Sequence, residues 1–335
     1  DHMSSASAMV SAEGRNFYIF DEGPTASILL SSNFQLIARD AFSGVLLWKR
    51  PIPKWHTQLW RLKSGPASLP RRLVAVGQRV YVTLGLDAPV SQLDAATGKT
   101  LRTYQQTANT EELLVDGRML LVVIDDSPLV QPPLPKNFIY DFSESPRRVL
   151  AVDVESGKTL WEHKARWVTP LSLTADGKRV LFYDGQSVVC LQQATGAELW
   201  QTPVGRRTSV PSYYGPTLVS HQGVILFAGS DPESTEYHTD NAKTLFALDA
   251  ATGRRLWTAE HPMSGYRSPE DILVIDGLVW TAPLFLGGHS GIFTGRELRT
   301  GEVKVEFPPN VNTYWFHHRC YRADFLDASA GIEKV

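Results

Sequence analysis

Histidine and arginine side chains that could bind a ligand are concentrated in the second half of the chain, in long loops and in one aromatic run. The run Tyr314–Arg319 reads Tyr-Trp-Phe-His-His-Arg, and the other residues lie in separate polar segments. Neutral imidazoles suit zinc, copper, iron or manganese, and guanidinium groups form paired hydrogen bonds with carboxylates or sulfate. These residue types predict a ligand-binding site built from His317, His318, Arg319, Arg267, His289 and His238.

Two interpretations of these side chains stay open. Alternation along a strand sends His317 and His318 to opposite faces, so only one of them can share a metal site with a distant histidine such as His221. The preferred interpretation is packing at a rim, because the histidines show no fixed, short ligand spacing. Arg267 could equally form an ion pair with Asp271 instead of binding a ligand.

Aromatic residues offer a second kind of site. They could stack on sugars, but aromatic rings also fill the wedges between packed sheets. The residues in question are Trp55, Trp60, Tyr213, Tyr214, Tyr266 and Trp315.

An internal repeat must position these side chains. Its unit is an alternating apolar run, then Asp, two further residues, Thr or Ser, Gly, and a second run that ends in Trp. The Asp side chain can accept hydrogen bonds from amides two residues on, and the glycine supplies the positive φ that closes a turn. Each unit is therefore predicted to be a two-stranded hairpin. The five clear units are Ala38–Trp48, Gln92–Arg102, Ala151–Trp161, Cys190–Trp200 and Ala247–Trp257, with turn glycines Gly44, Gly98, Gly157, Gly196 and Gly253. A sixth unit, Gly295–Val305, keeps only the Thr-Gly pair.

Two further strand-like runs precede most hairpins, for example Leu73–Val76 and Val80–Leu84 before the second one. Four strands that recur every ~40 to 60 residues are typical of a β-propeller. We therefore predict an all-β propeller of about seven four-stranded blades, or alternatively of eight blades with part of the ring missing.

The expected domain organisation is a single propeller over residues 9–335. Only two strand-like runs, Tyr314–Tyr321 and Phe325–Val335, are left for the last blade, which is expected to be incomplete. Residues 1–8 are expected to be a vector remnant and a linker, because Asp-His-Met is typical of an expression vector.

Charge and hydropathy argue against two classes of partner. The 33 basic and 35 acidic side chains give a net charge of −2, which is unlike the broad cationic surface of a nucleic-acid-binding protein. No apolar run reaches the ~18 residues of a membrane span. Pairing of Cys190 with Cys320 is left open by the sequence, and buried free thiols are the preferred interpretation.

The pattern Ala-x-Asp-x-x-Thr/Ser-Gly-x-x-x-Trp resembles the PQQ-like repeat, which is named for quinoprotein dehydrogenases and shared with BamB-like proteins. The resemblance covers about six of seven repeats. It implies that Trp48, Trp161, Trp200 and Trp257 pack against the neighbouring blade. It also implies that this dock is lost or replaced where the repeat departs from the pattern, at Arg102, Gln192 and Val305.

Longer stretches, Leu69–Val90 and His317–Tyr321, resemble uncharacterised PQQ-like propellers of environmental bacteria, some of which are fused to enzymatic domains. We predict a non-catalytic scaffold of an exported or multidomain bacterial protein. The resemblance implies that it is located in the periplasm or outside the cell. A protein partner, a small molecule or a carbohydrate would bind at the rim where the long loops between blades meet.

The alternative function is a carbohydrate-active propeller, a metal-assisted lyase or hydrolase. A PQQ-dependent dehydrogenase is disfavoured, because the sequence has no adjacent cysteines and no evident additional set of Glu, Asn and Asp ligands. No cofactor is therefore expected, with a histidine-bound metal as the alternative.

Overall fold

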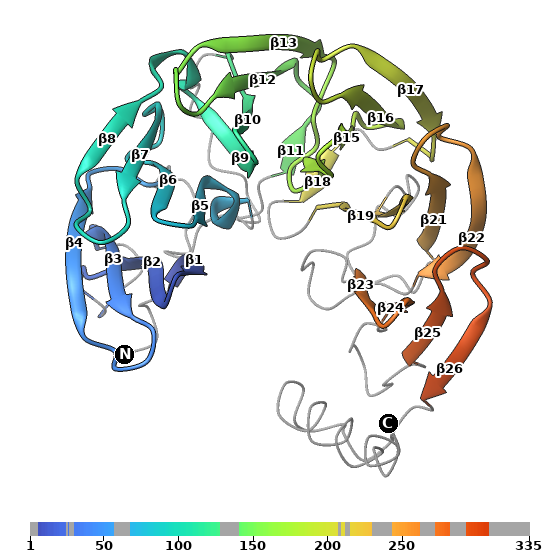
Figure 1. Cartoon of the computed structure of the whole chain (residues 1–335), viewed down its shortest axis with the longest axis horizontal. Helices are drawn as coiled ribbons and strands as arrows, with labels where there is room; N and C mark the ends of the chain where they lie inside the picture. Colours follow the sequence, from blue (N-terminus) through green and yellow to red (C-terminus); the bar gives the residue numbers. More distant parts are fainter. Residues whose placement is uncertain are drawn as a thin grey trace.

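The computed structural model describes residues 6–24, 26, 30–56, 68–127, 141–206, 209–211, 215–229, 243–261, 272–281 and 293–307. Six four-stranded antiparallel sheets follow one another around an open arc, each running from an inner to an outer strand in sequence order (Figure 1). The prediction of an all-β propeller is confirmed. The residues expected to begin a seventh blade, from Tyr314 onward, lie outside the described part of the chain.

The strands have the following bounds. The first sheet contains β1 (Ala6–Ala12), β2 (Arg15–Asp21), β3 (Phe34–Asp40) and β4 (Leu46–Ile52). The second contains β5 (Leu73–Val76), β6 (Arg79–Thr83), β7 (Val90–Asp94) and β8 (Thr100–Thr103). The third contains β9 (Thr110–Asp116), β10 (Met119–Ile124), β12 (Arg147–Asp153) and β13 (Thr159–Ala165). The fourth contains β14 (Thr174–Ala175), β15 (Arg179–Tyr183), β16 (Ser187–Gln192) and β17 (Glu198–Pro203). The fifth contains β19 (Thr217–His221), β20 (Val224–Ala228), β21 (Lys243–Asp249) and β22 (Arg255–His261). The sixth contains β23 (Ile272–Ile275), β24 (Leu278–Thr281), β25 (Phe293–Glu297) and β26 (Val303–Phe307).

Four smaller elements lie outside the six four-stranded sheets. Strands β11 (Asp141–Ser143) and β18 (Ser209–Pro211) pair with each other, and two short 3-10 helices, η1 (Leu69–Arg72) and η2 (Gln105–Thr107), precede the second and third sheets. No helix within the described stretches is long and apolar enough to cross a lipid bilayer.

The propeller begins earlier than the expected boundary at residue 9. Strand β1 starts at Ala6, and Ala8 pairs with Ile19 of β2. Ser7 and Ala8 are both buried, so residues 6–8 belong to the first sheet rather than to a linker.

The hairpin turns are held by local hydrogen bonds. In the second sheet, the Asp94 carboxylate accepts from the Thr97 hydroxyl at 2.8 Å and from the Thr97 amide at 2.9 Å, and Gly98 adopts a φ of 69°. Equivalent turns join the third and fourth strands of all six described sheets. Because the sheets share one strand order and follow one another around the arc, these turns lie on one rim, which we call the hairpin rim. We call the opposite rim the loop rim.

The core consists of five hydrophobic clusters, one between each pair of adjacent described sheets. Strand β10 shows how one strand serves two of them. Leu120 and Val122 pack toward the second sheet, whereas Leu121 and Val123 pack toward the fourth. The middle strands are therefore apolar on both faces, and they read as nearly continuous hydrophobic runs.

A tryptophan dock joins neighbouring blades near the hairpin rim. The indole nitrogens of Trp48, Trp161, Trp200 and Trp257 donate to backbone carbonyls of the next blade, at 3.0, 2.7, 3.1 and 2.9 Å. Each ring also lies against the turn glycine of that blade. A Cβ atom at Gly196 would lie 2.6 Å from the Trp161 ring, so only glycine fits there.

The second blade uses a different dock. Arg102 occupies the tryptophan position, and its guanidinium donates to the carbonyls of Glu155 at 2.7 Å and Ser156 at 3.2 Å. The Tyr104 hydroxyl donates to the Val154 carbonyl at 2.9 Å, and this carbonyl corresponds in the repeat to those that accept from an indole in the other docks. Arginine and tyrosine together thus replace one tryptophan.

Candidate functional site

The residues that the sequence analysis proposes as ligand-binding lie outside the described part of the chain. The structure therefore leaves their arrangement as a prediction. These residues are Arg267, His238, His289, His317, His318 and Arg319.

Trp55 and His56 belong to a loop on the loop rim, and both are packing residues. Trp55 is fully buried, and its indole donates to the Ser7 hydroxyl at 2.8 Å. The buried His56 ring meets the Phe34 ring edge-on, with centroids 5.2 Å apart. Of the two interpretations left open for Trp55, stacking on a sugar is therefore wrong, because its ring fills the wedge between the first and second blades.

His221 and Cys190 can also be placed. His221 ends β19 immediately before a tight turn on the hairpin rim, and the histidines with which it was considered as a metal site lie outside the described residues. Among the described residues, no three His, Cys, Asp or Glu side chains are grouped closely enough to hold a metal ion. Cys190 is a buried free thiol, and burial raises its pKa to about 12, whereas Cys320 lies outside the described residues.

A partly buried ion pair and a hydrogen bond to a backbone carbonyl together link three blades at the loop rim. Glu112, on the innermost strand of the third blade, is 3% exposed, and its Oε1 lies 3.5 Å from Nε of Arg71 in η1. Arg71 also donates to the Leu171 carbonyl, at the start of the fourth blade, at 3.3 Å. Leu171 has a φ of 69°, so this contact holds a strained backbone. Burial raises the pKa of Glu112 to about 7, although Arg71 opposes the shift.

A second ion cluster lies beside it. Arg147 donates to Glu111 at 2.6 Å and contacts Asp125 at 2.9 Å, so its buried guanidinium is neutralised by two carboxylates. Two neighbouring groups of charged side chains thus lie at the loop rim. These residues are not among the sequence-predicted site residues, and the only local signal is a Glu-Glu pair that precedes the short apolar run Leu113–Val115 in β9.

Replacing Glu112 with glutamine is expected to change how stability depends on pH. The folded-state pKa of about 7 lies above the usual 4.5, so the folded protein holds a proton that the unfolded chain releases between these pH values. Stability contributed by this proton is complete below pH ~4.5 and is lost as the pH rises through ~7. Relative to the wild type, Glu112→Gln should gain on the order of 2 kcal/mol between pH 5 and pH 8. Thermal unfolding at both pH values measures this, with exposed Glu198→Gln as the control. The prediction is contradicted if the difference in stability between the variant and the wild type is the same at pH 5 and at pH 8.

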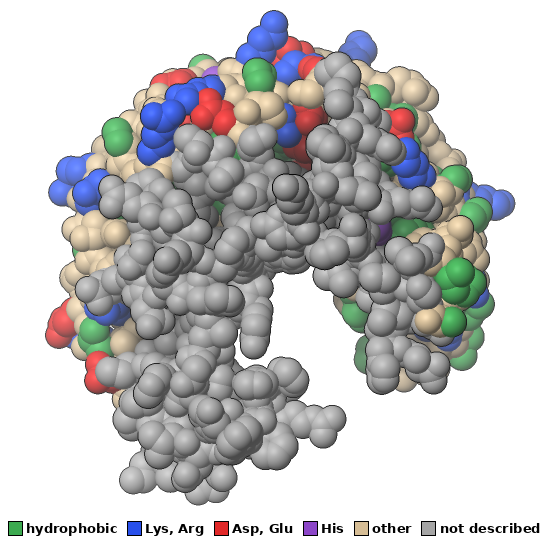
Figure 2. Space-filling model, turned by 180° about the vertical axis from the view of Figure 1, so that it is seen from behind, with side chains coloured by type: hydrophobic (Ala, Val, Ile, Leu, Met, Phe, Trp, Pro, Cys, Tyr) green, Lys and Arg blue, Asp and Glu red, His purple; other side chains and the backbone are tan. Residues whose placement is uncertain are grey.

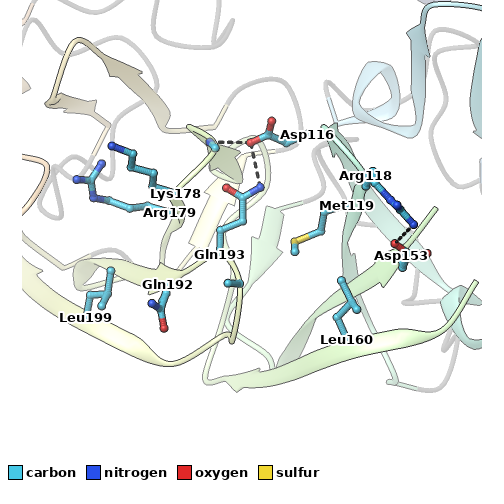
Figure 3. A pocket seen from close by; sticks show the side chains of 12 residues that line it. Asp116, Arg118, Met119, Asp153, Leu160, Lys178, Arg179, Gln192, Gln193 and Leu199 are labelled. Carbon is cyan, nitrogen blue, oxygen red and sulfur yellow. Dashed lines mark hydrogen bonds and ion pairs between the residues drawn. The ribbon is translucent and has the colours of Figure 1, made fainter. Parts of the chain in front are cut away.

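A groove opens on the hairpin rim between the third and fourth blades (Figure 3). Its volume is about 630 Å³. Leu160 and Leu199 stand on opposite sides, 48% and 50% exposed, with Met119 and Gln193 between them. The groove residues are Asp116, Arg118, Met119, Asp153, Leu160, Gly177, Lys178, Arg179, Gln192, Gln193, Ala194 and Leu199.

Hydrogen bonds between the two blades form the polar part of this groove. The Asp116 carboxylate accepts from the Gly177 amide at 2.7 Å and from Nε2 of Gln193 at 3.0 Å. That contact fixes the orientation of the Gln193 amide, because the opposite orientation would bring its oxygen against a carboxylate. The amide oxygen, Oε1 of Gln193, is buried and has no hydrogen-bond partner in the part of the chain that the structure describes.

Three cations and two carboxylates line the groove, namely Arg118, Lys178 and Arg179 with Asp116 and Asp153. Arg118 is 74% exposed and contacts Asp153 at 3.2 Å, and Arg179 donates to Asp176 at 2.9 Å. Lys178 is exposed, and its ammonium has no ion-pair partner among the residues that the structure describes. Figure 3 shows Lys178 and Arg179 extending from one bank and Arg118 standing on the other.

An apolar patch covers the end of the arc at the first blade. Figure 2 shows hydrophobic side chains gathered there, at the right of that view. Phe42 is 92% exposed, and Val45, Leu46 and Leu47 are also exposed. These residues lie in the turn at Gly44 and at the start of β4, where the tryptophan of a preceding blade would dock. Among the described residues, no atom lies within 4 Å of a Cβ added at Gly44.

Comparisons with known proteins support the repeat architecture. The sequence model of the PQQ_2 family, described as outer membrane protein assembly factor BamB, matches residues 145–315. A protein of Burkholderia pseudomallei (strain K96243) with that same description is 24% identical over 244 residues, which are 62% of this chain and 60% of the relative. The chain thus spans about three fifths of that relative.

Two solved structures share the fold. BamB from Moraxella catarrhalis superposes with a TM-score of 0.51 at 15% identity, over 88% of this chain and 70% of that one. The quinohemoprotein alcohol dehydrogenase ADHIIG from Pseudomonas putida HK5 also gives 0.51, at 12% identity, over 90% and 58% of the two chains. At these identities the likeness concerns the fold alone, so it does not separate a binding scaffold from a dehydrogenase.

Proposed function

The chain belongs to the PQQ_2 family, described as outer membrane protein assembly factor BamB, and we propose that it is a non-catalytic propeller scaffold that binds a protein partner. Its PQQ-like repeats and propeller fold are shared with that family. A bacterial, exported and periplasmic setting is part of the proposal, and it is supported by the similarity to the Burkholderia pseudomallei protein described as an outer membrane protein assembly factor.

One observation of the structure carries the proposal. Leu160 and Leu199 occupy the same position in successive repeats, immediately before the docked tryptophan, and both face one groove while half exposed. Exposed apolar side chains that flank a groove are typical of a protein interaction site. The tryptophan docks beneath them hold both banks rigidly, which reduces the entropy that binding must overcome.

Photo-crosslinking tests the proposal. Benzoylphenylalanine in place of Leu199 should crosslink one defined protein from a bacterial envelope extract, whereas the same group in place of Leu101 should not. Leu101 is the matched control, because it holds the same repeat position, is equally exposed and lies outside the groove. The purified partner must then bind the wild-type protein and bind Leu160→Asp more weakly. Equal crosslinking at both positions, or no loss of binding in Leu160→Asp, would refute a scaffold that uses this groove.

The proposal includes no quinone cofactor. Its support is the sequence, which has two cysteines at distant positions and therefore no adjacent pair. Adding the quinone together with calcium should leave the absorbance spectrum of the mixture equal to the sum of its parts. A stable complex with alcohol-dependent dye reduction would show instead that the chain is a dehydrogenase.

A further inference from the structure

We infer that the groove between the third and fourth blades binds an extended peptide segment in which an apolar residue is flanked by acidic residues. The inference rests on the proposed function and specifies the class of partner. It is carried by the apolar centre of the groove, by the cations at its edges and by one unpartnered buried acceptor.

The apolar requirement comes from the two leucines. Leu160 and Leu199 line the groove from opposite sides, with Met119 between them in the view of Figure 3. An aliphatic or aromatic side chain inserted there would remove apolar surface of all three residues from water. A purely polar ligand would leave these surfaces without a partner.

The acidic requirement comes from the balance of charges. Both carboxylates of the groove already accept hydrogen bonds, Asp116 from Gly177 and Gln193, and Asp153 from the Ser156 amide at 2.7 Å. Two of the cations have weaker interactions within the protein. Lys178 has no ion-pair partner among the described residues, and the highly exposed Arg118 forms only a surface pair, which is weak and readily exchanged. A carboxylate on either side of the inserted apolar residue can therefore pair with a cation on each bank.

The requirement for a backbone comes from Gln193. Its Oε1 is a buried acceptor that has no hydrogen-bond partner among the described residues, in a side chain that is 7% exposed. Leaving such an acceptor unpaired is costly, and a peptide N–H that reaches the floor of the groove can donate to it. An extended peptide supplies such donors at regular intervals, whereas a fatty acid or a free anion supplies none.

Fluorescence anisotropy with labelled peptides tests the inference. The probe is a fluorescein-labelled octapeptide whose central leucine is flanked on both sides by glutamate. Two comparison peptides replace every glutamate with glutamine, or the leucine with serine. The acidic leucine peptide should bind at least about tenfold more tightly than either, and its affinity should fall as salt is raised from ~0.05 to ~0.5 M.

Matched variants locate the binding. Leu199→Asp and Lys178→Glu should each weaken binding of the acidic peptide about tenfold or more. Leu101→Asp and Lys99→Glu, at exposed positions of the second blade, should leave it within about twofold of wild type. Thermal unfolding of all four confirms that each variant is folded.

Three outcomes would overturn the inference: equal affinity for the acidic and glutamine peptides, equal losses in the groove and control variants, or no binding of any peptide. If no peptide binds while the crosslink at position 199 persists, the scaffold function stands and the class of partner is wrong. If the crosslink also fails, the proposed function fails with it.

Discussion

Replacing Gly196 with alanine is expected to lower the free energy of unfolding by about 3 kcal/mol, through overpacking and backbone strain combined. The added Cβ would lie 2.6 Å from the ring of Trp161, which is itself buried against the fourth blade. The ring cannot retreat freely, because its indole nitrogen is held by the Gln193 carbonyl at 2.7 Å. Chemical denaturation of the purified variant measures the loss.

Gly44 provides the matched control for this substitution. It holds the same turn position with nearly the same φ, 72° against 71°, but among the described residues no atom lies within 4 Å of its would-be Cβ. Gly44→Ala should therefore cost only the backbone term, about 1 kcal/mol. Equal losses in the two variants would show that the contact between blades contributes nothing, and would contradict the role assigned to the tryptophan dock.

Replacing Arg72 with alanine is expected to cost about 4 kcal/mol or to prevent folding. The guanidinium is 3% exposed and donates to the Thr83 hydroxyl at 2.9 Å and to the Trp55 and Leu86 carbonyls at 2.9 and 3.0 Å. It also lies over the Trp55 ring, 4.5 Å from its centroid. Alanine would leave these acceptors buried without donors. Burial lowers the pKa of Arg72 only to about 10, so the side chain stays charged at neutral pH.

Two further variants keep this prediction testable if Arg72→Ala does not fold. Arg72→Lys retains the charge but offers a single ammonium in place of the fork, so its melting temperature should lie between those of wild type and alanine. Arg79→Ala removes an exposed arginine whose pair with Asp94 spans 3.8 Å, and it should cost less than ~1 kcal/mol. Thermal unfolding ranks all three variants, and a loss in Arg79→Ala as large as in Arg72→Lys would contradict the prediction.

Much of the fold could be predicted because the repeat signals are local. In the turn at Asp94, the acceptor, the donor Thr97 and the glycine lie within five consecutive residues, so no distant contact is needed to form the turn. The same holds for the fourth blade, where Gln192 replaces the aspartate and accepts from the Thr195 hydroxyl at 2.6 Å. The boundary at residue 9 was less accurate, because strand β1 begins with small residues that carry no apolar alternation.

The candidate sites were less predictable, since their partners are distant in sequence. Gln193 meets Asp116 across 77 positions, and Arg71 meets the Leu171 carbonyl across 100. The loop-rim residues favoured by the sequence analysis lie outside the described residues, so that prediction stands untested. The groove lies on the other rim, where the hairpins looked short and uniform, because its shape arises from two neighbouring blades rather than from any single repeat.

The sequence alone was enough to predict the strand order within each blade and the hairpin turns. It also predicted the apolar runs of the middle strands, which pack into a hydrophobic core on each face of the sheet. These features depend on residues a few positions apart, whose backbone preferences and hydrogen bonds act before any distant contact forms. Only the tertiary structure decided that Arg102 with Tyr104 replaces a tryptophan dock, that Trp55 is buried, and that Leu160 and Leu199 face one groove. The physical reason is that docks, burial and grooves belong to pairs of blades, and their geometry follows from how the blades pack around the arc.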